Sequence, residues 1–178
     1  MHLNDFNLNN ESFDIEPELI VSKIINERSE VIYTNKNTLD PYGYDLNCFN
    51  KINNNFVGYV EVERSKHKIL GRKGTNWKHS FLMRKILVYN ENQYHDQILK
   101  DNADKTIYIK FNKNYGLDDC ICCCIEDITF FDSEWQRKTG DVRKDLVFRT
   151  SQYNSKVAKG IDNCIIYIDK FFNEIMEK

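Results

Sequence analysis

A run of eight residues, 56–63 (FVGYVEVE), constrains the fold more than any other segment. Side chains alternate between the two faces of a strand, so Glu61 and Glu63 are expected on one face and Val60 and Val62 on the other. This pattern predicts a sheet strand with one apolar face and one face that carries two carboxylates. Three asparagines at 53–55 directly precede the run and predict a hairpin turn into it.

A basic tract (residues 64–85) follows the run and contains no Asp or Glu. The whole chain has a formal net charge of −2, and the tract alone carries +8, which leaves −10 for the rest. Such uneven charge favours a localised binding face for a polyanion, although basic tracts are also common on solvated surfaces. The predicted nucleic-acid-binding residues are Arg64, Lys66, Lys68, Arg72, Lys73, Lys78, Arg84 and Lys85. Trp77 fits either base stacking or anchoring in the core.

Length and composition predict one folded domain over residues 1–178, since 41% of the residues are hydrophobic. Neither a signal peptide nor an apolar stretch of membrane-spanning length is visible, so we expect an intracellular, cytoplasmic protein with no membrane partner. Abundant Asn, Lys and Ile indicate an AT-rich genome, which a virus, a phage or a cell could have. Four of the six cysteines lie within residues 120–124, a spacing that favours core packing over disulfides or zinc.

The expected secondary structure is a mostly antiparallel middle between two terminal helices. Pro17 fits the first turn of a helix that ends near Arg28, and apolar residues from Ile161 to Ile175 recur with helical spacing. Strands are expected at residues 31–33, 44–49, 56–63, 77–83, 106–111, 120–128 and 146–148, and a helix within 85–100. This order predicts an α/β (α+β) fold in which helices flank a central mixed, largely antiparallel sheet.

Asp45 lies on the expected strand before the one that carries Glu61 and Glu63. Paired strands can bring such carboxylates within a few ångströms, close enough to share a hard cation. Mg²⁺ binds through one or two carboxylates plus substrate phosphate, and a third carboxylate could act as general base. Asp40 is a rival for the first position, but it precedes the strand.

These residues resemble the PD-(D/E)XK nuclease superfamily, whose pattern is an Asp at a hairpin and then Glu/Asp-x-Lys on the next strand. Asp45 matches the first position, Glu61 the second, and Glu63 stands where the family usually has Lys. The resemblance covers roughly residues 14–113. It implies a restriction-endonuclease-like sheet, cleavage of DNA with Mg²⁺ or Mn²⁺, and a homodimer. It also implies Glu18 as a further metal ligand, and Lys66, Arg84 and Lys85 as sources of positive charge.

The substitution at position 63 leaves two interpretations. Either Glu63 binds metal or acts as base while Lys66 or Lys85 supplies the cation, or the chain is catalytically inactive. The predicted catalytic residues are Asp45, Glu61, Glu63, Lys66 and Lys85; the predicted metal ligands are Asp45, Glu61, Glu63 and Glu18. The alternatives to an endonuclease are an inactive nuclease-fold module that binds nucleic acid or protein, and an unrelated α+β protein with acids on its surface. His67 lies near enough in sequence to assist.

Overall fold

A computed structural model describes residues 16–39, 43–65, 69–70, 78–81, 102–112, 116–127, 131–136, 142–149 and 157–178. The chain forms an α+β fold, as predicted. Its helices are α1 (Pro17–Arg28), the 3-10 turn η2 (Ala103–Lys105) and α4 (Ile161–Met176). Its strands are β1 (Ile32–Lys36), β2 (Leu46–Asn50), β3 (Phe56–Ser65), β4 (Lys78–Phe81), β5 (Thr106–Asn112), β6 (Gly116–Cys124), β7 (Phe131–Gln136), β8 (Val142–Arg149) and β9 (Ala158–Lys159).

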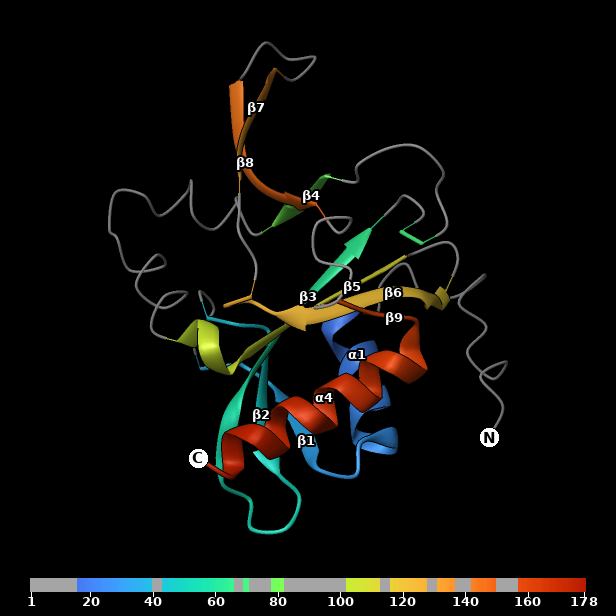
Figure 1. Ribbon diagram of the computed structural model, residues 1–178, viewed down its shortest axis with the longest axis vertical. Coiled ribbons are helices and arrows are strands. Elements are labelled where there is room, and N and C mark those ends of the chain that lie inside the picture. Colours follow the sequence, from blue (N-terminus) through green and yellow to red (C-terminus); the bar gives the residue numbers. More distant parts are fainter. Residues whose placement is uncertain are drawn as a thin grey trace.

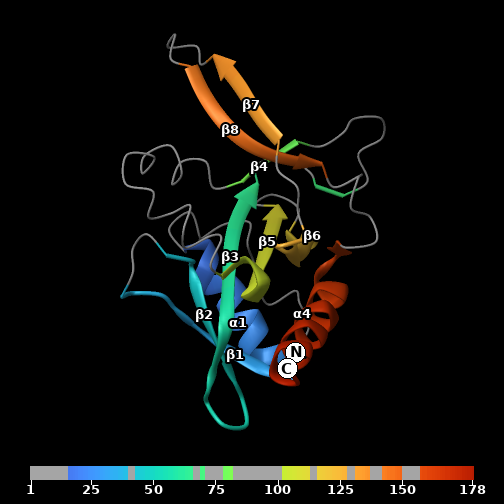
Figure 2. The same ribbon diagram turned by 60° about the vertical axis from the view of Figure 1, so that its left-hand side comes forward.

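The main sheet has six strands in the order β1-β2-β3-β5-β6-β9. All neighbours are antiparallel except β3 and β5, which run parallel, so the sheet is mixed and largely antiparallel as predicted. Strands β4, β8 and β7 form a separate antiparallel sheet. Helices α1 and α4 lie on one side of the main sheet, and the smaller sheet lies past the ends of β3 and β5 toward which their arrowheads point (Figures 1 and 2). No described helix combines the length and apolar character needed to cross a bilayer.

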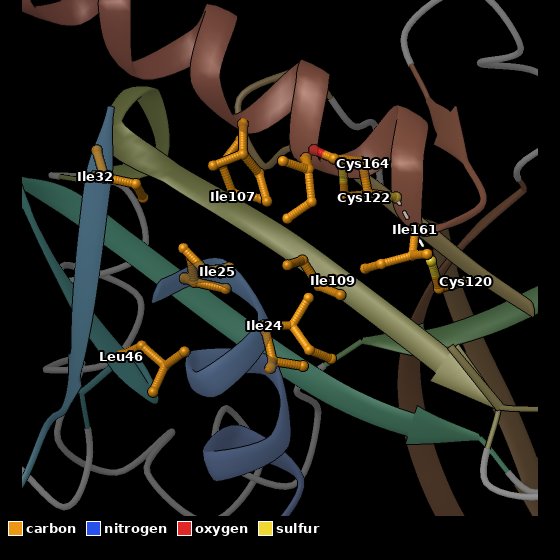
Figure 3. Close-up of a cluster of buried hydrophobic side chains, with 14 of the residues drawn as sticks. Ile24, Ile25, Ile32, Leu46, Ile107, Ile109, Cys120, Cys122, Ile161 and Cys164 are labelled. Atoms are coloured by element: carbon orange, nitrogen blue, oxygen red, sulfur yellow. Dashed lines mark hydrogen bonds between the residues drawn. The ribbon is translucent and has the colours of Figure 1, made fainter. Parts of the chain in front are cut away.

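The hydrophobic core fills the space between the main sheet and the two helices, and we call this side of the sheet the helical face. Figure 3 shows Ile107 and Ile109 of β5 among side chains from α1 and α4. Both are buried, as are Ile25 of α1 and Ile168 and Phe172 of α4. Fully burying an isoleucine stabilises a fold by roughly 1.5–3 kcal/mol, so the apolar spacing of the two helices accounts for their position.

The cysteine cluster belongs to this core, as the sequence predicts. Cys120 and Cys122 face the helices, where the Cys120 Sγ lies 3.6 Å from the Cys164 Sγ, while Cys123 faces the opposite side. All six cysteines are free thiols, and burial raises the pKa of Cys122. These thiols therefore behave as small neutral hydrophobes.

Gly58 allows β3 to pass close beneath η2. A Cβ atom at this position would lie 2.2 Å from the backbone carbonyl oxygen of Lys105, closer than van der Waals contact permits. Gly58 pairs with Cys48 next to a shift in the β2–β3 register, and its φ of +155° is rare for other residues. Glycine at this point thus lets β3 continue from the predicted hairpin into the centre of the sheet.

Most elements lie where the sequence predicts them. The helix at 17–28, the hairpin before β3, the C-terminal helix and the strands within 77–83 and 146–148 are confirmed. Strand β6 begins at Gly116 and ends at Cys124, earlier at both ends than expected. The parallel pairing of β3 with β5 was not predicted, and the helix expected within 85–100 lies outside the described residues.

Candidate active site

The two glutamates of β3 lie on the side of the main sheet opposite to the helices, which we call the acidic face. Val60 is fully buried in the core on the helical face, so the predicted alternation of carboxylates and valines is confirmed. The parallel register of β3 and β5 sets Glu61 beside Tyr108 and Glu63 beside Lys110. These two strands run side by side through the middle of the sheet (Figure 2).

Glu63 is held at both carboxylate oxygens by side chains of β5. The Lys110 ammonium donates to Oε1 at 2.9 Å, and the Tyr108 hydroxyl donates to Oε2. Lys110 is only 5% exposed, whereas the Glu63 side chain is 29% exposed. A buried ammonium is stabilised only by good hydrogen-bonding geometry, which this carboxylate provides. Glu63 is thus fixed in orientation and still open to solvent.

Tyr108 is a neutral hydrogen-bond donor in this group. Its side chain is completely buried. Burial, together with the neighbouring Glu63 carboxylate, raises the pKa of the Tyr108 hydroxyl well above its ordinary value. Both effects disfavour a tyrosinate, so the hydroxyl keeps its proton and points it at Glu63.

Glu61 is the most deeply buried carboxylate of the predicted site, with 4% of its surface exposed. It lies within electrostatic reach of two tyrosines, Tyr44 and Tyr108. Burial is the main reason that the pKa of Tyr44 is raised, and the Glu61 charge adds to that shift. Two protonated phenols therefore lie close to this carboxylate.

Asp45 is joined directly to the strand that carries the glutamates. Its Oδ2 accepts a hydrogen bond of 2.9 Å from the backbone N–H of Val62. The β2–β3 register pairs Leu46 with Val60, and one further step places Asp45 opposite Glu61. The geometry therefore supports the prediction that Asp45 lies beside the Glu-x-Glu strand. Its carboxylate also adds a hydrogen bond to β3 from the residue that directly precedes β2.

These carboxylates offer at most a small set of ligands to a metal ion. No group of three or more His, Cys, Asp or Glu side chains within the described ranges is arranged to hold one. Asp45 and Glu61 supply hard oxygen donors from adjacent strands, which fits Mg²⁺ or Mn²⁺ that keeps part of its water shell. Glu18 of α1 lies 3.6 Å from the Lys36 ammonium, which also binds Glu16. Metal binding by Asp45, Glu61, Glu63 and Glu18 stays a prediction.

The predicted basic residues are only partly within the described structure. Arg64, the first residue of the basic tract, lies near the end of β3 and is half-buried. Lys78 begins β4, where only the backbone is described. The remaining predicted cations lie outside the described residues: Lys66, Lys68, Arg72, Lys73, Arg84 and Lys85. Asp40, His67 and Trp77 lie outside them as well.

Sequence reasoning missed Tyr108 and Lys110. Alternation along residues 106–111 places both on one face of a strand, and a lysine within such an apolar run was the available signal. Their position beside the glutamates follows only from the parallel β3–β5 pairing.

Comparison of the chain with family models, curated proteins and solved structures finds no match. The side chains of the acidic face are therefore the basis for assigning a chemistry.

Proposed function

We propose that this protein is a metal-dependent endonuclease that hydrolyses phosphodiester bonds in DNA on the acidic face of the main sheet. The observation that carries the proposal is the buried Lys110 ammonium, 2.9 Å from Oε1 of Glu63 on the strand that also carries Glu61. The PD-(D/E)XK resemblance places a lysine at position 63, where this chain has Glu. Lys110 supplies an ammonium at that level of the sheet from the neighbouring strand.

The three carboxylates have two different roles. Asp45 and Glu61 would hold Mg²⁺ or Mn²⁺, which when bound lowers the pKa of its water and stabilises charge on the scissile phosphate. Glu63 is exposed enough to meet a water molecule, and both of its oxygens are oriented by β5. We assign Glu63 as the general base that accepts the proton of the attacking water.

Lys110 and Tyr108 are positioning residues in this proposal. The Lys110 ammonium holds one oxygen of the Glu63 carboxylate in place through a charge-assisted hydrogen bond, and the Tyr108 hydroxyl fixes the second oxygen. Arg64 and the rest of the basic tract would bind the DNA backbone through its phosphates, without regard to sequence. Lys66, Arg84 and Lys85 remain candidates for charge at the scissile phosphate. Cleavage of both strands would use two active sites, so the proposal includes a homodimer.

A second candidate is an inactive nuclease-fold module that binds nucleic acid or protein. Two observations favour it: both oxygens of Glu63 are already engaged, and the described residues hold no three-ligand group for a metal. In that case the Glu63–Lys110 pair would only stabilise the sheet.

Plasmid cleavage with Mg²⁺ or Mn²⁺ separates these candidates. We expect the wild type to cut, and Glu61→Gln and Asp45→Asn to lose cutting, because both variants keep the side-chain shape but remove the charge. Glu16→Gln is the matched control, since Glu16 binds Lys36 at the start of α1. Salt-sensitive DNA binding without cleavage by the wild type in either metal would establish the module instead. Cutting by Glu61→Gln at the wild-type rate would contradict the proposed site.

A further inference from the structure

Four aromatic side chains form a continuous row across the first three strands of the main sheet. The row consists of Tyr33 on β1, Phe49 on β2, and Phe56 and Tyr59 on β3. The Tyr33 and Phe49 rings stack with centroids 5.3 Å apart, Phe49 and Phe56 meet edge-on at 6.0 Å, and Phe56 and Tyr59 at 4.9 Å. The strand register pairs Tyr33 with Phe49 and Phe49 with Phe56.

This aromatic row lies on the same face of the sheet as the glutamates. The strand neighbours Ile32, Cys48 and Val57 are buried in the core against the helices, so alternation directs the row to the acidic face. The row remains partly accessible, and Phe56 is 47% exposed. Tyr59 packs against the buried ring of Tyr44, with centroids 5.0 Å apart, and anchors the row to the core. Cross-strand aromatic pairs stabilise a sheet, but the partly exposed rings of Tyr33, Phe49 and Phe56 also offer apolar surface to a ligand.

The row leads toward the proposed active site. Tyr59 precedes Glu61 by two residues on the same face, a separation of about 7 Å along a strand. Asn35 and Asn47 are paired across β1 and β2 next to the row, and Asn47 is paired in turn with Tyr59. Their amides can both donate to and accept from the edges of bases.

Charge identifies the class of ligand. Strand β3, which carries Phe56 and Tyr59, continues in the chain into the basic tract, a sequence that contains eight Lys and Arg residues and no Asp or Glu. Aromatic rings can stack on flat apolar groups, and a run of cations without acids attracts a polyanion. The expected ligand therefore combines flat apolar groups with negative charge. A single nucleic-acid strand has this chemistry, whereas the bases of a duplex are already stacked on one another.

We propose that the aromatic row stacks on unpaired bases of a single-stranded nucleic acid and directs that strand to Glu61 and Glu63. Stacking is tolerant of sequence because every base has a π face, so the row would select unpaired over paired substrate rather than a sequence. Binding of the single strand to the aromatic row does not depend on nuclease activity. The direction of that strand toward the carboxylates rests on the proposed nuclease function.

Fluorescence anisotropy of a labelled oligothymidylate of about 12 nucleotides, measured in EDTA so that no cleavage occurs, tests the binding step. We expect Phe56→Ala and Tyr33→Ala each to weaken binding about tenfold, and Phe56→Trp to retain it. Ile52→Ala is the matched control, because Ile52 is an apolar side chain of the adjacent hairpin turn that is 93% exposed. Thermal melting of each variant verifies that it is folded.

The outcomes separate this inference from the proposed function. Wild-type affinity in folded Phe56→Ala and Tyr33→Ala, or equal affinity for the duplex of the same length, overturns the inference even if the protein cuts DNA. A dimer lost in Phe56→Ala without a change in oligothymidylate binding would assign the row to protein contact and overturn it too. Ring-dependent binding of the single strand, with no cleavage in Mg²⁺ or Mn²⁺, would confirm the binding step and reject the nuclease.

Discussion

The two faces of the main sheet carry side chains of different character, although these side chains alternate along the same strands. On β5, Ile107 and Ile109 face the helices, while Tyr108 and Lys110 alternate with them on the acidic face. All four side chains are buried. Burying an isoleucine stabilises the fold directly, whereas burying a lysine requires a hydrogen-bonded partner of opposite charge. The helical face therefore supplies most of the stability, whereas the placement of charged side chains on the acidic face lowers it.

Carboxylates of the acidic face also differ from one another in what they contact. Asp119 of β6 accepts hydrogen bonds from the backbone N–H groups of Ile69 and Leu70, at 2.7 Å and 2.6 Å. This carboxylate ties Ile69 and Leu70 to β6, which is a structural role. Glu63 accepts hydrogen bonds from the side chains of Tyr108 and Lys110 on β5 and remains partly open to solvent. Asp119 thus has both of its oxygens on backbone amides, whereas Glu63 is held by side chains and is partly exposed, which makes Glu63 the stronger candidate for catalysis of the two.

The largest effect on stability is expected on the helical face. Phe172→Ala removes a completely buried ring from the core and should lower the free energy of unfolding by about 3–5 kcal/mol. Urea denaturation measures the loss. Cleavage per folded molecule should stay unchanged, because the ring lies on the side of the sheet opposite to Glu63. An intact stability in this variant would contradict the division between the faces.

The Lys110–Glu63 pair should show a smaller effect on stability. Lys110→Met leaves the Glu63 carboxylate without its ammonium, and we expect a loss of about 1–2 kcal/mol, less than for a fully buried pair because Glu63 is partly solvated. The double variant Lys110→Met/Glu63→Gln should recover part of this loss, since no charge remains to be desolvated. Urea denaturation of the two single variants and the double variant gives the coupling energy. Additive losses would show that the two side chains do not interact.

The pH dependence of stability should reveal the buried tyrosine. The pKa of Tyr108 is raised in the folded protein from an ordinary value of 10.0, so above about pH 10 the unfolded chain releases a proton that the folded chain keeps. Stability contributed by this group is complete below pH 10 and falls as the pH rises further. In that range the free energy of unfolding of Tyr108→Phe should fall by about 1.4 kcal/mol less per pH unit than that of the wild type. Parallel stability curves for the two proteins would contradict a buried, protonated Tyr108.

The smallest effect concerns the thiols. All six cysteines are buried, and burial raises the pKa of Cys124 to about 11 from 9.0. Because the thiolate is the reactive form, a thiol-specific reagent at pH 8 should modify the folded protein slowly and the denatured protein at once. Rapid labelling of Cys120 or Cys122 at pH 8 would contradict their place in the core.

The sequence predicts those parts of the structure that depend on neighbours along the chain. Alternation in residues 59–63 establishes the two faces of β3 at the candidate site, Pro17 marks the start of α1, and the apolar spacing after Ile161 establishes α4. Each of these signals lies within one element. The candidate site is predictable to the same extent: Asp45, Glu61 and Glu63 follow from one hairpin.

What the sequence does not predict is the contact between distant elements. Strands β3 and β5 pair in parallel although some forty residues separate them, and this pairing alone places Lys110 beside Glu63. The aromatic row likewise requires three strands in register, including the shift between Cys48 and Phe49. Each of these residues belongs to a type that is common in strands. Only the pairing register between the strands brings them together into a candidate site.

Single-turnover cleavage of a labelled DNA strand in Mg²⁺ tests the central claim, that Lys110 and Glu63 serve the reaction across the β3–β5 pair. Lys110→Met is compared with Lys51→Met, whose ammonium donates to backbone carbonyls of Asn26 and Ser29 on the helical side. We expect a loss of at least about 100-fold in rate for Lys110→Met and less than about twofold for Lys51→Met. Cleavage by folded Lys110→Met at the wild-type rate would contradict the account.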